Sequence, residues 1–149
     1  MFLALGHVRG YKGLEDIVHA YRRLADPDAM LLIAGRPLGE ADRQALTRLA
    51  GGDPGIRLHV RDISNDDIQD YFHAADAAVF AGAPQLASGS LLLALSFGVP
   101  VIYPDSPLSQ ELLTQDVGAV YAPEALAAAM TRVRRADRLQ LAAHARQLA

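Results

Sequence analysis

The segment of residues 6–13, GHVRGYKG, carries residue types suited to holding an anion. It follows an apolar run and precedes residues at helical spacing, so we expect it to join the carboxyl end of a strand to a helix. His7, Arg9 and Lys12 offer N–H donors or positive charge, and Gly6 allows close approach of the backbone. In open α/β sheets such junctions bind phosphate groups, which makes the segment a candidate phosphate-binding loop.

A second candidate is the sequence Ser88-Gly89-Ser90, which opens a strongly apolar helical pattern. The N–H groups and positive dipole end of a helix start attract an anion, and a glycine there lets the anion come close. The same residues also fit a purely structural role, with Ser88 as the N-cap and Gly89 as a packing glycine. Lys12 and Arg9 at a neighbouring strand end favour phosphate binding.

Further candidates follow three other predicted strands, because ligands of parallel sheets bind beyond the carboxyl ends of the strands. These residues are Gly35, Arg36, Arg61, Asp62 and Gln85.

Several common kinds of site are not indicated. The chain has no cysteine, which excludes disulfides and thiolate chemistry. It lacks both the G-x-G-x-x-G dinucleotide fingerprint and the phosphate-binding G-x-x-x-x-G-K-[ST] motif. The histidines lack metal-ligand spacing, so no metal site is expected, and we interpret four of them as structural or surface residues: His19, His59, His73 and His144.

The elements that must position these residues alternate along the chain. Apolar runs predict six buried strands, at residues 2–8, 30–35, 56–60, 76–80, 99–104 and 118–122. Helical patterns lie between and after them, at residues 14–26, 40–50, 64–75, 88–97, 107–114 and 123–149, with Ser64 and Ser106 as expected caps and the helix at 88–97 largely buried. We therefore predict one α/β domain, residues 1–149, with a Rossmann-like parallel sheet of about six strands and helices on both faces.

Net charge and hydropathy limit the kinds of binding partner and the cellular locations that we expect. The net charge of −3 gives no footprint for nucleic acid, and we interpret the late arginines, Arg132, Arg134, Arg135 and Arg138, as a solvated helix face. No apolar run is long enough to span a membrane, and no signal peptide is recognisable. The chain opens directly on an apolar strand, so we expect it to be a piece of a longer protein.

The chain resembles the C-terminal, donor-binding domain of glycosyltransferases of the GT-B fold, in the large retaining group often called group 1. The resemblance covers residues 2–130 and rests on FLALGHVRGYKGLEDIVHAYRRL, MLLIAG, YFHAADAAVF and SGSLLLALSFGVPVIYPD. Gly6, Lys12 and Gly13 match the family loop G-R-x-x-x-x-K-G, whose arginine and lysine hold the donor diphosphate. His7 stands in the place of that arginine, and Arg9 is expected to supply the missing charge.

The family also carries two glutamates, eight positions apart, around the donor helix. The first lies near the transferred sugar and the second commonly holds the ribose. Counting back from Gly98, these positions are Gln85 and Leu93. Gln85 still offers hydrogen bonds, but Leu93 cannot bind ribose hydroxyls, so the family's standard retaining catalysis does not follow and no catalytic residue is assigned.

The resemblance implies half of a GT-B fold that binds a nucleoside-diphosphate sugar as its donor substrate. The sugar would pass to an acceptor on a missing N-terminal domain, without a metal ion or another cofactor. The phosphates of the donor would contact Gly6, His7, Arg9, Lys12 and the Ser88-Gly89-Ser90 helix start. Its base or sugar would contact the five further candidates named above.

Alternatives to this function are a non-catalytic nucleotide-sugar or partner-binding module and, more weakly, a sugar-nucleotide epimerase. A cytoplasmic location is expected, and any membrane contact would come through the missing domain.

Overall fold

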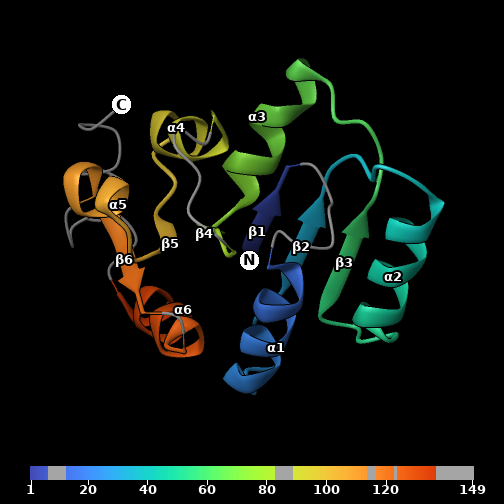
Figure 1. Ribbon diagram of the computed structural model, residues 1–149, viewed down its shortest axis with the longest axis horizontal. Coiled ribbons are helices and arrows are strands. Elements are labelled where there is room, and N and C mark those ends of the chain that lie inside the picture. The colour runs from blue at the N-terminus through green and yellow to red at the C-terminus, as the bar shows by residue number, and fades with distance from the viewer. Residues whose placement is uncertain (7–12, 83–88, 114–116, 123, 137–149) are drawn as a thin grey trace.

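The computed structural model describes residues 1–6, 13–82, 89–113, 117–122 and 124–136. Its centre is a single sheet of six strands, all of whose pairings are parallel, in the order β3-β2-β1-β4-β5-β6 (Figure 1). The strands are β1 Phe2–Leu5, β2 Leu31–Ala34, β3 Ile56–His59, β4 Ala77–Val79, β5 Val101–Pro104 and β6 Gly118–Tyr121. All six lie within the predicted ranges, and the predicted Rossmann-like α/β fold is confirmed.

The described helices are α1 Leu14–Leu24, α2 Glu40–Ala50, α3 Asn65–Ala74, α4 Gly89–Ser96, α5 Pro107–Leu112 and α6 Leu126–Arg135. Two of them begin at the predicted caps. The Ser64 hydroxyl accepts the Asp67 N–H at 3.1 Å, and Ser106 forms a reciprocal capping box with Ser109. The last predicted helix, residues 123–149, is described only as α6, and its remainder lies outside the described residues.

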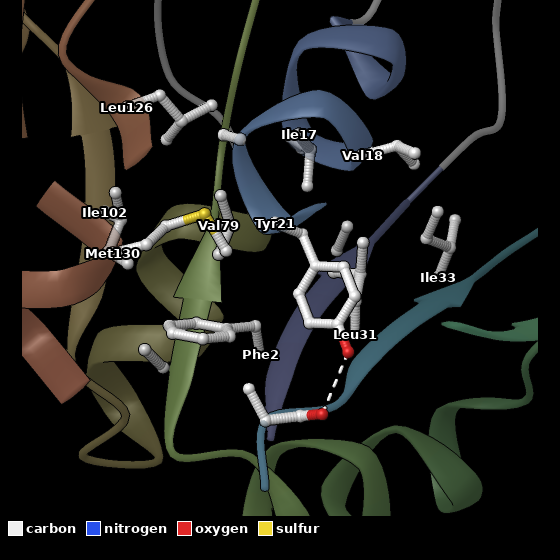
Figure 2. Close-up of a cluster of buried hydrophobic side chains, with 14 of the residues drawn as sticks. Phe2, Ile17, Val18, Tyr21, Leu31, Ile33, Val79, Ile102, Leu126 and Met130 are labelled. Atoms are coloured by element: carbon white, nitrogen blue, oxygen red, sulfur yellow. Dashed lines mark hydrogen bonds between the residues drawn. The ribbon is translucent and has the colours of Figure 1, made fainter. Parts of the chain in front are cut away.

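Alternate residues of each central strand feed two hydrophobic cores, one on each face of the sheet. Phe2 and Ala4 of β1 pack into a core with side chains of α1, α2 and α6. Leu3, between them, points to the other face, where α3 and α4 cover the sheet. Figure 2 shows the first core, in which the Tyr21 hydroxyl donates to the Ala29 carbonyl at 2.9 Å.

Two features of burial differ from the sequence prediction. The outer strands β3 and β6 are only partly buried, because an edge strand has a neighbour on one side only. Helix α4, predicted to be largely buried, buries Leu91, Ala94 and Leu95 but exposes Leu92 by 51% and Leu93 by 38%. A helix lying on a sheet covers it with one stripe, so even an apolar helix leaves its outer face in solvent.

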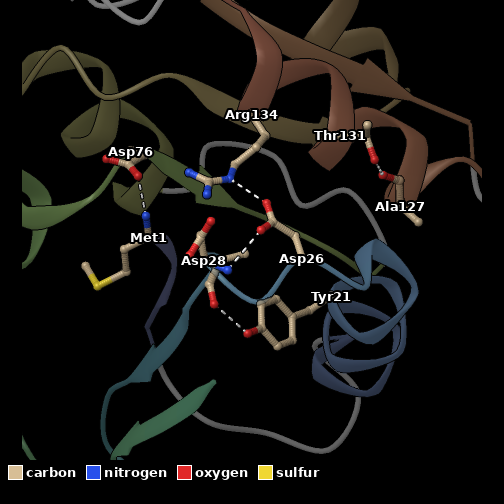
Figure 3. Close-up of polar contacts among 9 residues, drawn as sticks. Met1, Tyr21, Asp26, Asp28, Asp76, Ala127, Thr131 and Arg134 are labelled. Carbon is tan, nitrogen blue, oxygen red and sulfur yellow. Dashed lines mark hydrogen bonds and ion pairs between the residues drawn. The ribbon is translucent and has the colours of Figure 1, made fainter. Parts of the chain in front are cut away.

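An ion pair joins the last described helix to the first. Arg134 Nε of α6 lies 2.9 Å from Asp26 Oδ2, just beyond α1, and the two residues are 108 positions apart in the sequence (Figure 3). The hydrogen bond from Arg134 lowers the pKa of the Asp26 carboxyl below its usual value. Arg134 therefore links α6 to the end of α1, while it remains exposed together with Arg132 and Arg135, as expected of a solvated helix face. Arg138 lies outside the described residues.

Candidate functional site

The strand order creates a switch point between β1 and β4. From β1 the chain adds β2 and then β3 on one side, and it returns to place β4 on the other side of β1 (Figure 1). Connections from the two strands then run to opposite faces of the sheet, with α1 in one core and α4 in the other. In open α/β sheets ligands bind at such a point, beyond the carboxyl ends of the strands.

Two glycines close the carboxyl ends of β1 and β2 tightly against each other. The Gly6 N–H donates to the Ala34 carbonyl at 3.1 Å, and the Gly35 N–H donates to the His59 carbonyl at 3.1 Å. A Cβ atom on Gly35, at φ +143°, would lie 1.8 Å from the Gly6 carbonyl oxygen. No side chain fits between these strands, so bare backbone lines this part of the edge.

Gly13 brings the start of α1 to the chain that leaves β4. Its φ of +67° is left-handed, and a Cβ on it would lie 2.5 Å from the Gly82 nitrogen and 2.7 Å from the Ala81 carbonyl carbon. The end of the candidate loop 6–13 therefore lies directly against the backbone of Ala81 and Gly82. The end of the loop and the backbone that follows β4 thus lie on the two sides of the switch point, which is the arrangement expected of a phosphate site.

A group of charged side chains lies at the carboxyl ends of β2 and β3. Arg36 Nη1 and Asp62 Oδ2 are 3.7 Å apart, and both side chains are mostly exposed. The structure thus brings these two predicted site residues together where a ligand from solvent could reach them.

Arg61, the third predicted residue of this group, is directed toward α3. Its Nη2 lies 3.7 Å from Asp67 Oδ2 and 3.5 Å from the Tyr71 hydroxyl. Tyr71 also lies 3.2 Å from His59 Nδ1. Arg61 thus contacts α3, but its side chain is 61% exposed and stays as open to solvent as that of Arg36. His59 is exposed and contacts Tyr71, which fits its interpretation as a structural or surface residue.

The first residue of α4, Gly89, has no close neighbour among the described residues. Gly89 is exposed, and a Cβ on it would meet no described atom within 4 Å. The alternative that Gly89 is a packing glycine has no support from the described residues and stays a prediction, because residues 83–88 lie outside the described ranges. Ser90 is partly buried.

Five predicted site residues lie outside the described residues: His7, Arg9, Lys12, Gln85 and Ser88. The first three of them are the basic residues of the candidate loop. Their roles stay predictions. Within the described ranges, no group of three or more His, Asp or Glu side chains is placed to hold a metal ion.

Gly82 and Tyr71 were not among the site residues predicted from the sequence. Gly82 carried a signal, because it is a glycine just after a strand. The position of the Tyr71 hydroxyl beside His59 and Arg61 depends on how α3 packs against the end of β3, which the sequence does not reveal.

Residues 1–135 match the family described as glycosyl transferases, group 1. The chain belongs to this family. A curated relative is the GDP-mannose:glycolipid 4-beta-D-mannosyltransferase of Xanthomonas campestris, which is 29% identical over 116 residues. The match covers 78% of the chain and 33% of that relative, so the chain spans about a third of its length.

Solved structures show the same fold. The C-terminal domain of a glycosyl transferase group 1 family protein, LpcC, from Francisella tularensis aligns with a TM-score of 0.84 at 19% identity, covering 99% of this chain and 82% of that one. Anabaena Alr3699/HepE, solved with UDP, aligns with a TM-score of 0.79 at 21% identity, covering 99% and 43%. The chain thus has the fold of a C-terminal GT-B glycosyltransferase domain. Among its described helices, none has the length and hydrophobicity needed to cross a bilayer.

Proposed function

We propose that this glycosyltransferase domain binds the diphosphate of a nucleoside-diphosphate sugar at the β1–β4 switch point. The observation that carries the proposal is the contact of Gly13 with the backbone of Ala81 and Gly82. This contact places the end of the segment that contains Lys12 beside the chain leaving β4. The comparisons support the proposal, because the Anabaena protein of the same fold was solved with UDP.

The proposed chemistry needs no metal ion. Departure of a nucleoside diphosphate builds negative charge, which Lys12, Arg9 and His7 would neutralise together with the N–H groups at the start of α4. Arg36 and Asp62 lie further along the same edge, where they would contact the base or the sugar. A missing N-terminal domain would present the acceptor.

Calorimetric titration of the chain with GDP and UDP, in EDTA, tests the proposal. GDP is included because the Xanthomonas relative uses GDP-mannose, and UDP because of the Anabaena complex. Binding in EDTA is expected, and a strict need for a divalent ion would contradict metal independence.

Lys12→Ala should weaken the binding of the preferred nucleotide by about ten- to a hundred-fold, because it removes a charge-assisted hydrogen bond. The free energy of unfolding should change by no more than about 0.5 kcal/mol. Arg48→Ala is the matched control, since it removes one exposed positive charge from α2, away from the site. Wild-type affinity in Lys12→Ala would refute the role of this residue.

Lys12 also offers a direct chemical readout, because it is the only lysine in the sequence. A bound nucleoside diphosphate should protect this one side chain from an amine-reactive reagent, as measured by mass spectrometry of the peptide that contains it. Unchanged labelling at a saturating nucleotide concentration would place the diphosphate elsewhere.

A second candidate function is a nucleotide-sugar-binding module without catalysis. The observation that favours it is Leu93, an apolar side chain of α4 that is 38% exposed at the position of the family's second glutamate. Donor hydrolysis or sugar transfer by the full-length protein would exclude this alternative. Nucleotide binding without either activity would support it.

A further inference from the structure

The backbone carbonyl of Phe80, where the chain leaves β4, cannot receive a hydrogen bond from the neighbouring strand β5. Ladder bonds of a parallel pair alternate regularly between the strands. The Phe80 N–H donates to the Ile102 carbonyl at 2.8 Å, so the next bond should run from the N–H of residue 104 to the Phe80 carbonyl. Residue 104 is a proline and has no N–H.

Tyr121 supplies the missing donor from the strand beyond. It is the last residue of β6 and is aligned with Pro104 in the β5–β6 register. Its hydroxyl passes over β5 and donates to the Phe80 carbonyl at 2.8 Å. A side chain of β6 thus supplies the hydrogen bond that is missing at the end of β4, two strands away in the sheet.

The environment keeps this hydroxyl in its donor form. Tyr121 is 6% exposed. Burial raises the pKa of its phenol well above the usual value, and the negative charge of Asp16 in the first turn of α1 adds to the shift. The phenol therefore stays protonated across the pH range of ordinary assays.

The two residues after Phe80 are those that Gly13 contacts. Ala81 and Gly82 are held on one side by the start of α1, and just before them the chain is held by Tyr121. We propose that Tyr121 is a positioning residue of the donor site, whose hydroxyl fixes Phe80 and thereby the Ala81–Gly82 backbone at the switch point. This inference rests on the proposed function, because its ligand is the nucleoside diphosphate.

Tyr121→Phe tests the inference with little change in volume. We expect this variant to remain folded and to bind the preferred nucleoside diphosphate about three- to ten-fold more weakly, by calorimetry well below its melting temperature. A purely structural role would lower the melting temperature without changing the affinity of the folded chain. Tyr103→Phe is the matched control, since Tyr103 is buried beside Phe80 with its ring centroid 5.4 Å away and its hydroxyl has no hydrogen bond to a described residue.

The double variant Pro104→Ala/Tyr121→Phe tests the hydrogen bond itself. Alanine at residue 104 has an N–H that can donate to the Phe80 carbonyl, so the hydrogen bond between β5 and β4 should form. The affinity for the nucleoside diphosphate should then return toward the wild-type value. It also keeps the inference testable if Tyr121→Phe alone does not fold.

Wild-type affinity in folded Tyr121→Phe would overturn the inference while leaving the proposed function intact. An equal loss of affinity in Tyr103→Phe, or no recovery in the double variant, would also overturn it, because the loss would then not depend on this one bond. A wild-type chain that binds neither GDP nor UDP would instead refute the proposed function, and the role of Tyr121 toward that ligand with it.

Discussion

Replacing Gly13 by alanine should destabilise the fold and disturb the switch point together. Two costs add. A left-handed φ of +67° costs a residue with a Cβ atom about 1–2 kcal/mol. The new Cβ would lie 2.5 Å from the Gly82 nitrogen and 2.8 Å from the Ala81 Cβ, and forcing packed groups apart costs about 1–3 kcal/mol. The expected total is about 2–5 kcal/mol, which a domain of ordinary stability survives.

Gly52→Ala separates these two costs. Gly52 has a φ of +73°, close to that of Gly13, but a Cβ there would meet no described atom within 4 Å. Gly52→Ala should lower the free energy of unfolding by about 1–2 kcal/mol, which is the cost of the left-handed φ alone. Urea unfolding followed by circular dichroism gives both free energies from the same kind of transition.

The binding of nucleoside diphosphate provides the second readout for this pair. Gly13→Ala should weaken binding at a temperature where the variant is fully folded, because α1 and the chain leaving β4 must move apart. Gly52→Ala should bind like the wild type. If the two variants lose the same free energy of unfolding, the close contact between Gly13 and Gly82 is not present in solution and the reasoning about the switch point fails.

Two further predictions concern stability. Since Arg134 lowers the pKa of Asp26, the pair stabilises the fold above the ordinary carboxyl pKa of about 4 and loses that effect as pH falls through the lowered value. Asp26→Asn should thus be less stable than wild type at pH 7 in urea unfolding, and the difference should vanish in acid; a difference constant with pH would refute the ion pair. Ser64→Ala should cost about 1 kcal/mol in the same assay, because it removes the acceptor for the Asp67 N–H. No measurable loss would mean that water satisfies this N–H equally well.

Local sequence signals predicted most of the secondary structure. Apolar runs such as residues 30–35 gave rise to buried strands, and the helix predicted at 40–50 begins and ends at those residues. The caps at Ser64 and Ser106 were also predictable. Each of these features depends on residues within a few positions of one another, so the sequence shows them directly.

The candidate site was predictable only as a set of loops. Alternating strands and helices indicated that residues after the strands would share one edge, and the structure places Gly6, Gly35, Arg36 and Asp62 there. Which of them face a ligand depends on side-chain partners. Arg61 was predicted with equal weight, yet it contacts Asp67 and Tyr71 of α3.

The class of fold, the family and the residue types available at the switch point were all predictable from the sequence. The tertiary structure alone decided which distant residues meet. Gly13 contacts Gly82, Asp26 pairs with Arg134, and Tyr121 bonds to Phe80 across an intervening strand. These contacts depend on the order of the strands and on their register, which follow from the packing of both faces at once. A local pattern carries no record of that order, so only the folded chain reveals that a proline in β5 is compensated by a tyrosine in β6.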